Sequence, residues 1–178
     1  AAMWRARGDV VRFVSLTDGR SGHHEMDPDA LVARRRMEAA SSAGLIDAEC
    51  LVLDIPDGHL EPTLVNRLKV IRVIREFKPD LVITVAVMEV IDGINLARAL
   101  AAMELTANIP VTLLTSLGND NRELEYLPDG MAIVRHGENF SADLAEMLAA
   151  LETGEMKLLA MTSREAFRHA TGDPALSN

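Results

Sequence analysis

An aspartate, an arginine and two histidines gather in one short segment and are the side chains best suited to chemistry. Asp18 and Arg20 directly follow an apolar run, and His23 and His24 come next. Imidazole nitrogens and carboxylate oxygens are common zinc ligands, and a guanidinium suits an anionic group of a substrate. The candidate catalytic residues are therefore Asp18, His23 and His24. Arg20 and His23 are candidates for substrate binding.

The two histidines are only weak candidates for a metal site. A hydrolytic zinc needs about three protein ligands and one open position for water. Adjacent histidines in an extended loop are expected to point in different directions, and the sequence has no histidine between His59 and His136. We therefore expect no bound cofactor. A polar loop beside a substrate cleft is the alternative.

The bulk composition is typical of one globular domain. The chain has 178 residues, of which 48% are hydrophobic and 25% charged, with a net charge of −9. That charge argues against binding a nucleic acid by this chain alone. A single cysteine, Cys50, excludes an internal disulfide and fits a cytoplasmic protein, and no apolar stretch is long enough to span a membrane. Ala1–Arg7 is typical of the end of a helix, so we expect further residues before Ala1.

Apolar runs alternate with helical patterns along the chain, which predicts a parallel sheet with helices on both faces. The expected strands span residues 10–16, 49–55, 81–87, 109–115 and 131–135. The expected helices span about 27–42, 63–77, 92–103, 120–126, 141–151 and 155–170. Asp27 is the expected N-cap of the first of these helices. The second is predicted from the helical spacing of Leu64, Leu68, Ile71 and Ile74.

Segments of the first half resemble a known enzyme family. The clearest are Thr17-Asp18-Gly19-Arg20, Asp54-Ile55-Pro56-Asp57-Gly58 and Lys78-Pro79-Asp80-Leu81-Val82. Residues 1–84 thereby resemble the PIG-L/LmbE family of zinc-dependent N-acetylglucosaminyl deacetylases. In that family, ligands and base come from a His-Pro-Asp-Asp motif before the first strand found here and from a later histidine segment. Neither segment has a counterpart here, and Val85–Arg98 contains no histidine.

The second half resembles a different family. The matching text is Asp80–Thr84, Val90–Leu100, Ala107–Thr115 and Phe140–Leu144. Residues 80–155 are similar to the second half of a CheY-like response-regulator receiver domain. The resemblance places Val85 at the phosphoacceptor position, Thr115 at the hydroxyl position and Arg135 or His136 near the lysine position. Since a valine cannot be phosphorylated, this is a degenerate receiver, with Mg²⁺ as cofactor only if the pocket is functional.

A weaker resemblance lies at the end of the chain. Met161–Glu165 and Leu176–Asn178 resemble the opening of a LuxR-type helix-turn-helix. The helix that would contact DNA would lie beyond Asn178, and chance explains the match about as well.

The two resemblances together imply a flavodoxin-like (Rossmann-like) three-layer α/β/α sandwich. We expect a five-stranded parallel sheet in the order 2-1-3-4-5 within a single domain, residues 1–154, joined from halves 1–84 and 85–154. Residues 155–178 would form a C-terminal helix and tail. The first and third strands would be neighbours, so that Thr17, Asp18, Val85, Ala86 and Thr115 would share one pocket. The residues expected to be buried are Val14, Leu53, Val82, Leu113 and Ile133.

Three functions remain open on the sequence. The first is a non-phosphorylatable receiver-like regulatory module that acts by contact with a protein partner, or by self-association through its receiver-like half. The second is a zinc-dependent N-acetyl-sugar deacetylase whose N-terminal metal-binding segment is absent from this sequence. The third is an engineered hybrid, joined near Asp80–Val85, with no evolved activity. We favour the first, because each resemblance lacks residues that its family needs for catalysis: the metal-binding segments of the deacetylases, and the phosphoacceptor aspartate that Val85 replaces.

Overall fold

The fold was determined as a computed structural model. It describes residues 1–85, 93–104, 106–115, 122–124, 127–128, 131–135 and 157–162, together with residues 142, 145 and 149. The helices are α1 (Ala2–Ala6), α2 (Pro28–Gly44), α3 (Leu64–Phe77) and α4 (Gly93–Ala101), with a short 3₁₀ turn η1 (Arg122–Leu124). The strands are β1 (Val10–Ser15), β2 (Glu49–Val52), β3 (Leu81–Val85), β4 (Val111–Thr115), β5 (Ala132–Arg135) and β6 (Lys157–Thr162). The helix expected over residues 141–151 lies largely outside the described residues.

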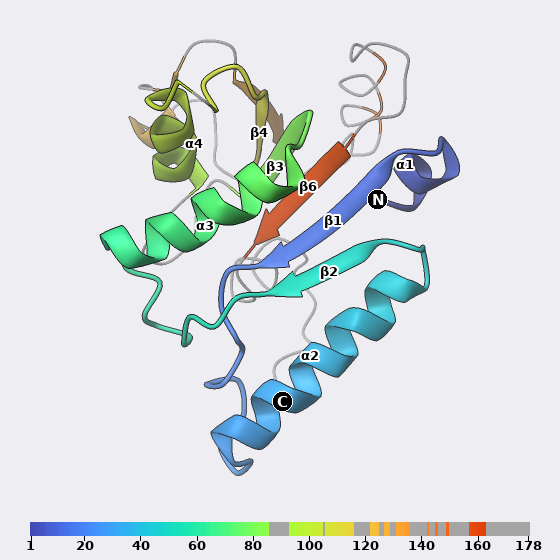
Figure 1. The fold of residues 1–178 in the computed structure, drawn as a ribbon, viewed down its shortest axis with the longest axis vertical. Coiled ribbons are helices and arrows are strands. Elements are labelled where there is room, and N and C mark those ends of the chain that lie inside the picture. Colours follow the sequence, from blue (N-terminus) through green and yellow to red (C-terminus); the bar gives the residue numbers. More distant parts are fainter. Residues whose placement is uncertain are drawn as a thin grey trace.

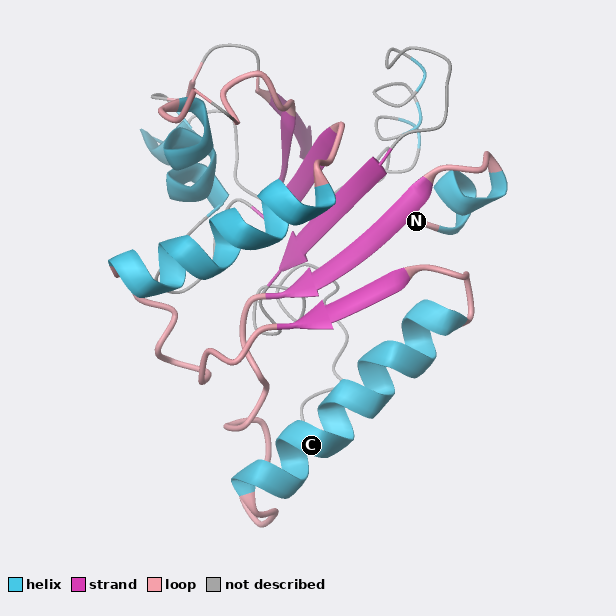
Figure 2. Ribbon diagram, in the orientation of Figure 1, coloured by secondary structure: helices cyan, strands magenta, loops and turns pink. Residues whose placement is uncertain are grey.

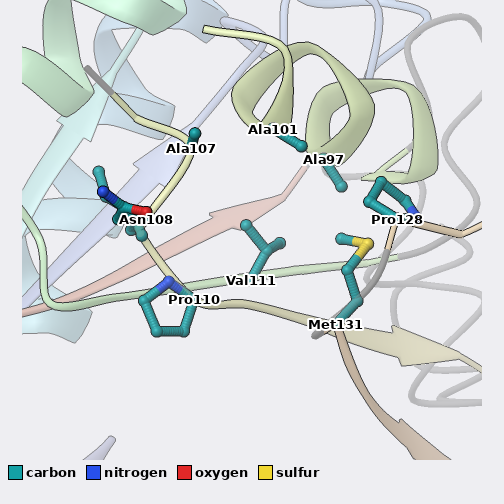
Figure 3. Close-up of a pocket in the computed structure, with 9 residues that line it drawn as sticks. Ala97, Ala101, Ala107, Asn108, Pro110, Val111, Pro128 and Met131 are labelled. Atoms are coloured by element: carbon teal, nitrogen blue, oxygen red, sulfur yellow. The ribbon is translucent and has the colours of Figure 1, made fainter. Parts of the chain in front are cut away.

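The strands form one parallel sheet in the order β2-β1-β6-β3-β4-β5 (Figures 1 and 2). The expected α/β class with a parallel sheet is confirmed. The expected order 2-1-3-4-5 is wrong at its centre, because a sixth strand lies between β1 and β3. Those two strands are therefore not neighbours.

The sixth strand, β6, comes from the segment expected to be a C-terminal helix. It pairs with β1 from Val10↔Lys157 to Ser15↔Thr162 and with β3 from Leu81↔Leu158 to Thr84↔Met161. At its start, the Lys157 amide donates to the Asp80 carboxylate at 2.8 Å, and the Asp80 amide donates to the Lys157 carbonyl at 2.9 Å. The helix expected over residues 155–170 is thus wrong over 157–162, which belong to the sheet.

Buried side chains lie on both faces of the sheet. On one face, Val14, Val82 and Leu159 pack with residues of α3 and α4 in one cluster. On the other, Val11, Leu81, Ile83 and Leu158 pack with Trp4 of α1. Four of the residues expected to be buried are buried: Val14, Leu53, Val82 and Leu113. The fifth, Ile133, is only half-buried, and its neighbour Val134 is buried instead.

Helices begin where the sequence predicts. The Asp27 carboxylate accepts hydrogen bonds from the amides of Asp29 and Ala30, which caps α2. The Thr63 hydroxyl accepts from the Asn66 amide and caps α3. None of the helices in the described part of the chain has the length and apolar character needed to cross a bilayer.

The apolar residues that predict α3 agree only in part with those that pack on the sheet. The residues of α3 buried against the sheet are Val70, Val73, Ile74 and Phe77. Leu64 and Leu68 of the expected stripe are exposed instead. Ile74 of the expected stripe is buried and Ile71 is half-buried, so the prediction is wrong for the N-terminal half of the helix only.

Because β6 is covered on both faces and paired on both edges, truncating one of its core side chains should be costly. We expect Leu159→Ala, at a fully buried position, to lower the free energy of unfolding by about 2 to 5 kcal/mol. Urea unfolding measures the loss. Leu45→Ala is the control, since Leu45 is 86% exposed and its truncation should change stability by less than about 0.5 kcal/mol. Equal small effects of the two substitutions would contradict the placement of β6.

Candidate functional site

The candidate site lies at the carboxyl edge of the sheet. From β1 the chain moves outward to β2, and from β3 it moves outward in the other direction to β4 and β5. In open parallel sheets, ligands bind outside the carboxyl ends of the strands where this direction reverses. Here that point is the edge formed by the ends of β1, β6 and β3.

Asp18, just after β1, is held by Arg20. Its carboxylate is buried, and its Oδ2 accepts a hydrogen bond from Nε of Arg20 at 2.8 Å and lies 2.8 Å from a terminal nitrogen of the same guanidinium. The other oxygen, Oδ1, accepts from the Arg20 backbone amide at 3.1 Å. The hydrogen bond that Arg20 donates to the Asp18 carboxylate raises the pKa of Arg20 above its usual value. Both carboxylate oxygens are therefore already engaged by one residue.

The loop after β1 is fixed by the loop after β2. The Asp18 amide donates to the Ile55 carbonyl at 2.9 Å, and the Ser21 amide donates to the Asp57 carboxylate at 3.2 Å. Gly19 has a φ of 78°, and a Cβ placed on it would lie 3.3 Å from Cγ of Arg35. A side chain at position 19 would be strained, so glycine is needed for this turn.

His23 and His24 stack on each other in the exposed loop that follows. Their ring centroids lie 5.3 Å apart with planes 6° from parallel, so the expectation that they point in different directions is wrong. The Nδ1 atom of His23 accepts hydrogen bonds from the amides of Glu25 and Met26, both at 3.1 Å. Only Nε2 of that ring is left to meet a ligand. The Nε2 atom of His24 lies 3.7 Å from the Glu25 carboxylate.

The receiver-like residues do not gather as expected. Because β6 separates β1 from β3, the ends of these two strands are about 10 Å apart, twice the spacing of neighbouring strands. Asp18 therefore does not face Val85. Val85 pairs with Leu114, and the next residue of β4, Thr115, pairs with Arg135 of β5. Thus Val85, Thr115 and Arg135 lie on successive strands, while Asp18 lies beyond β6. Ala86 and His136 lie outside the described residues.

Two residues near the end of β3 were not predicted from the sequence: Thr84 of the strand itself and Gly93 of α4. Thr84 is fully buried, and its hydroxyl has no hydrogen-bond partner among the residues that the structure describes. A Cβ placed on Gly93, the first residue of α4, would lie 2.2 Å from the Val85 carbonyl oxygen and 2.9 Å from the Thr84 methyl group. Gly93 thus lets the helix approach the strand end closely. A glycine at the start of a predicted helix was the only available signal, and nothing in the sequence marks Thr84.

A sequence model of one family matches the chain. It is PIG-L, described as GlcNAc-PI de-N-acetylase, and it matches residues 1–103. This chain belongs to that family. A search of curated proteins finds no match.

Solved structures of receiver domains are similar to the chain at low sequence identity. One, from a DNA-binding response regulator of Colwellia psychrerythraea 34H, is 16% identical with a TM-score of 0.40, over 79% of this chain and 98% of that one. A second, from Methanoculleus marisnigri JR1, is 13% identical with a TM-score of 0.38, over 82% and 98%. A third, from a histidine kinase of Syntrophus aciditrophicus, is 17% identical with a TM-score of 0.42, over 82% and 95%.

The zinc ion that the PIG-L resemblance implies does not fit the residues that are described. Among them, no group of three or more His, Cys, Asp or Glu side chains could hold a metal ion. The Asp18 oxygens are bonded to Arg20, and His23 presents a single nitrogen. The described residues therefore do not make up a zinc site.

The Asp18–Arg20 pair should contribute to stability, because removing the guanidinium would leave a buried carboxylate with fewer donors. We expect Arg20→Ala to lower the free energy of unfolding clearly more than the loss of an exposed arginine does. Arg20→Lys should recover only part of this, because an ammonium cannot reproduce the two-nitrogen contact. Denaturant unfolding is the measurement, with the exposed Arg36→Ala on α2 as control. Equal stability of Arg20→Ala and Arg36→Ala would contradict the pairing.

The close approach at Gly93 predicts a second effect on stability. Gly93→Ala forces the helix away from the Val85 carbonyl, so we expect a loss of about 2 kcal/mol or more. Gly44→Ala, near the end of α2 where a Cβ meets nothing within 4 Å, should change stability by less than about 1 kcal/mol. Thermal unfolding of both variants is the test, and a Gly93→Ala protein as stable as the native chain would refute the contact.

Proposed function

We propose that this chain is a non-catalytic regulatory member of the PIG-L family, with a receiver-like second half, that works through contact with other proteins. The observation that carries the proposal is the state of Asp18. A carboxylate with both oxygens hydrogen-bonded to one arginine is poorly placed to bind a metal or accept a proton.

The end of β3 supports the same proposal. A receiver needs an aspartate there to accept a phosphoryl group, with further carboxylates nearby to hold Mg²⁺. In this chain that position carries the alkyl side chain of Val85, and Asp18 is two strand spacings away. Of the other residues that the resemblance assigns to a receiver pocket, Thr115 lies on the neighbouring strand β4 and Arg135 lies one strand further out, on β5.

A second candidate, favoured by the family match over residues 1–103, is N-acetyl-sugar deacetylation with metal ligands from a segment outside this sequence. In that case the loop of Arg20 and His23 would contact the sugar. This candidate requires more than the described residues supply.

The proposal predicts that the chain neither deacetylates nor accepts phosphoryl groups. With zinc added, we expect no acetate release from an N-acetylglucosaminyl phosphatidylinositol substrate above the level without protein. With acetyl phosphate and Mg²⁺, mass spectrometry should show no added phosphoryl group, because Val85 offers no nucleophile. Acetate release that chelation and His23→Ala both abolish would establish the second candidate instead.

Two variants at position 85 test the receiver-like alignment separately. Val85→Asp restores a carboxylate at the strand end, and Val85→Asn is its uncharged match. Phosphorylation of Val85→Asp alone would support the alignment of β3 and β4 with a receiver. Phosphorylation of the native chain would overturn the proposed function.

A further inference from the structure

The outer side of α3 carries three exposed aliphatic residues. Leu64, Val65 and Leu68 are 71%, 64% and 50% exposed. Residues four apart lie on the same side of a helix, so Leu64 and Leu68 are adjacent, with Val65 beside them. Figure 1 shows α3 running roughly along the strands, and its opposite side packs on the sheet. These three residues form one apolar patch that faces away from the core.

Arginines continue this patch toward the end of the helix. Arg72 follows Leu68 at a spacing of four and Arg75 follows Arg72 at a spacing of three, so both lie on the outer side of α3, where they are exposed. Neither forms an ion pair with any residue that the structure describes. The helix has four cationic residues and one anionic residue, whereas the whole chain has a net charge of −9.

An acidic residue lies at the other end of the patch. Glu61 is exposed and precedes α3, and its backbone carbonyl accepts hydrogen bonds from the Thr63 amide and from Nδ2 of the buried Asn66 at 2.8 and 3.0 Å. These bonds fix Glu61 beside the first turn of the helix. Its carboxylate also lacks an ion-pair partner within the described part of the chain. We call Glu61, Leu64, Val65, Leu68, Arg72 and Arg75 the outer α3 surface.

Along α3, this surface carries first an acidic residue, then the aliphatic residues and then the basic residues. If a second copy is turned end to end, its basic end lies opposite the acidic end of the first. If two copies lie antiparallel around a twofold axis near the middle of the patch, Leu64 of each meets Leu68 of the other. Glu61 lies five residues before the axis and Arg72 six residues after it. Because each residue adds about 1.5 Å along a helix, Glu61 of each copy then comes opposite Arg72 of the other. A twofold interface uses the same surface on both copies, which is what this order permits.

We propose that the outer α3 surface is a self-association site, occupied by the same surface of a second copy of this chain. The proposal rests on the suggested role in protein contact and names one such contact. An anionic membrane fits less well, because the patch has no aromatic residue and the chain as a whole is strongly acidic. A purely acidic partner would leave Glu61 facing like charge.

The surface is small, so the pair should be weak. Three aliphatic residues from each copy and two ion pairs in all are typical of interfaces that bury less than about 1,200 Å² in total, as transient complexes do. We therefore expect a reversible equilibrium between monomer and dimer in the micromolar range or above.

Charge reversal with sedimentation equilibrium tests the proposal on the full chain. Glu61→Arg alone and Arg72→Glu alone should each weaken the dimer by about tenfold or more, because each places like charges opposite one another twice. An equimolar mixture of the two variants should associate as the native chain does, because both contacts then become Arg–Glu pairs. Arg36→Glu, an equal charge change on α2, should leave the native equilibrium unchanged.

Each alternative result is distinguishable. A native chain that stays monomeric, or a mixture that associates no better than the single variants, overturns the twofold pair. Binding of an acidic peptide or anionic vesicles by a chain that does not self-associate also overturns it. If the chain does not dimerise through the outer α3 surface, the predicted lack of catalysis is unaffected. If the chain proves to be a deacetylase, the proposed dimer is unaffected.

Discussion

The sheet depends on the two-sided pairing of β6. In the described sheet, neither β1 nor β2 pairs with any of β3, β4 and β5. The two groups of strands are joined through β6, which pairs with β1 on one edge and with β3 on the other. Leu158 and Leu159 point to opposite faces and join separate clusters of buried side chains. One strand thus contributes the ladder hydrogen bonds and the core contacts that join two halves. Because β6 is far from β1 and β3 in sequence, its contacts have a high loop-closure cost, which favours slow folding.

The same strand determines what the carboxyl edge can do. By separating β1 from β3, it keeps Asp18 away from Val85 and Thr115, so the acidic residue and the receiver-like residues do not form one pocket. Asp18 is satisfied locally by Arg20, and the loop that carries both is anchored to the end of β2. The site is therefore divided into a loop with a closed ion pair and a strand end with an aliphatic side chain. This division favours a regulatory role over catalysis.

Local signals predicted most of the elements, and tertiary context decided the rest. Asp27 and Thr63 cap helices as their types suggest, and the PIG-L resemblance is confirmed by the family match. The segment of β6, Lys-Leu-Leu-Ala-Met-Thr, contains good helix formers and no alternation, so sequence favours a helix. A central strand that is buried on both faces needs no alternation of apolar and polar residues. Pairing with β1 on one edge and β3 on the other outweighs the local preference of this segment for a helix. In α3, the spacing of apolar residues could not show that Leu64 and Leu68 stay exposed while Ile74 packs on the sheet. No local signal predicted the stacking of the two histidines or the buried hydroxyl of Thr84.

Native-state hydrogen exchange of the β-strand amides tests the central place of β6 most directly. If β6 joins the two halves, its amides must exchange only when the whole sheet opens. The amides of β1, β3 and β6 should then share the highest free energy of opening and respond alike to added denaturant. Rapid exchange of the Leu158–Met161 amides while those of β1 or β3 stay protected would show that the halves hold together without β6, and would contradict this account.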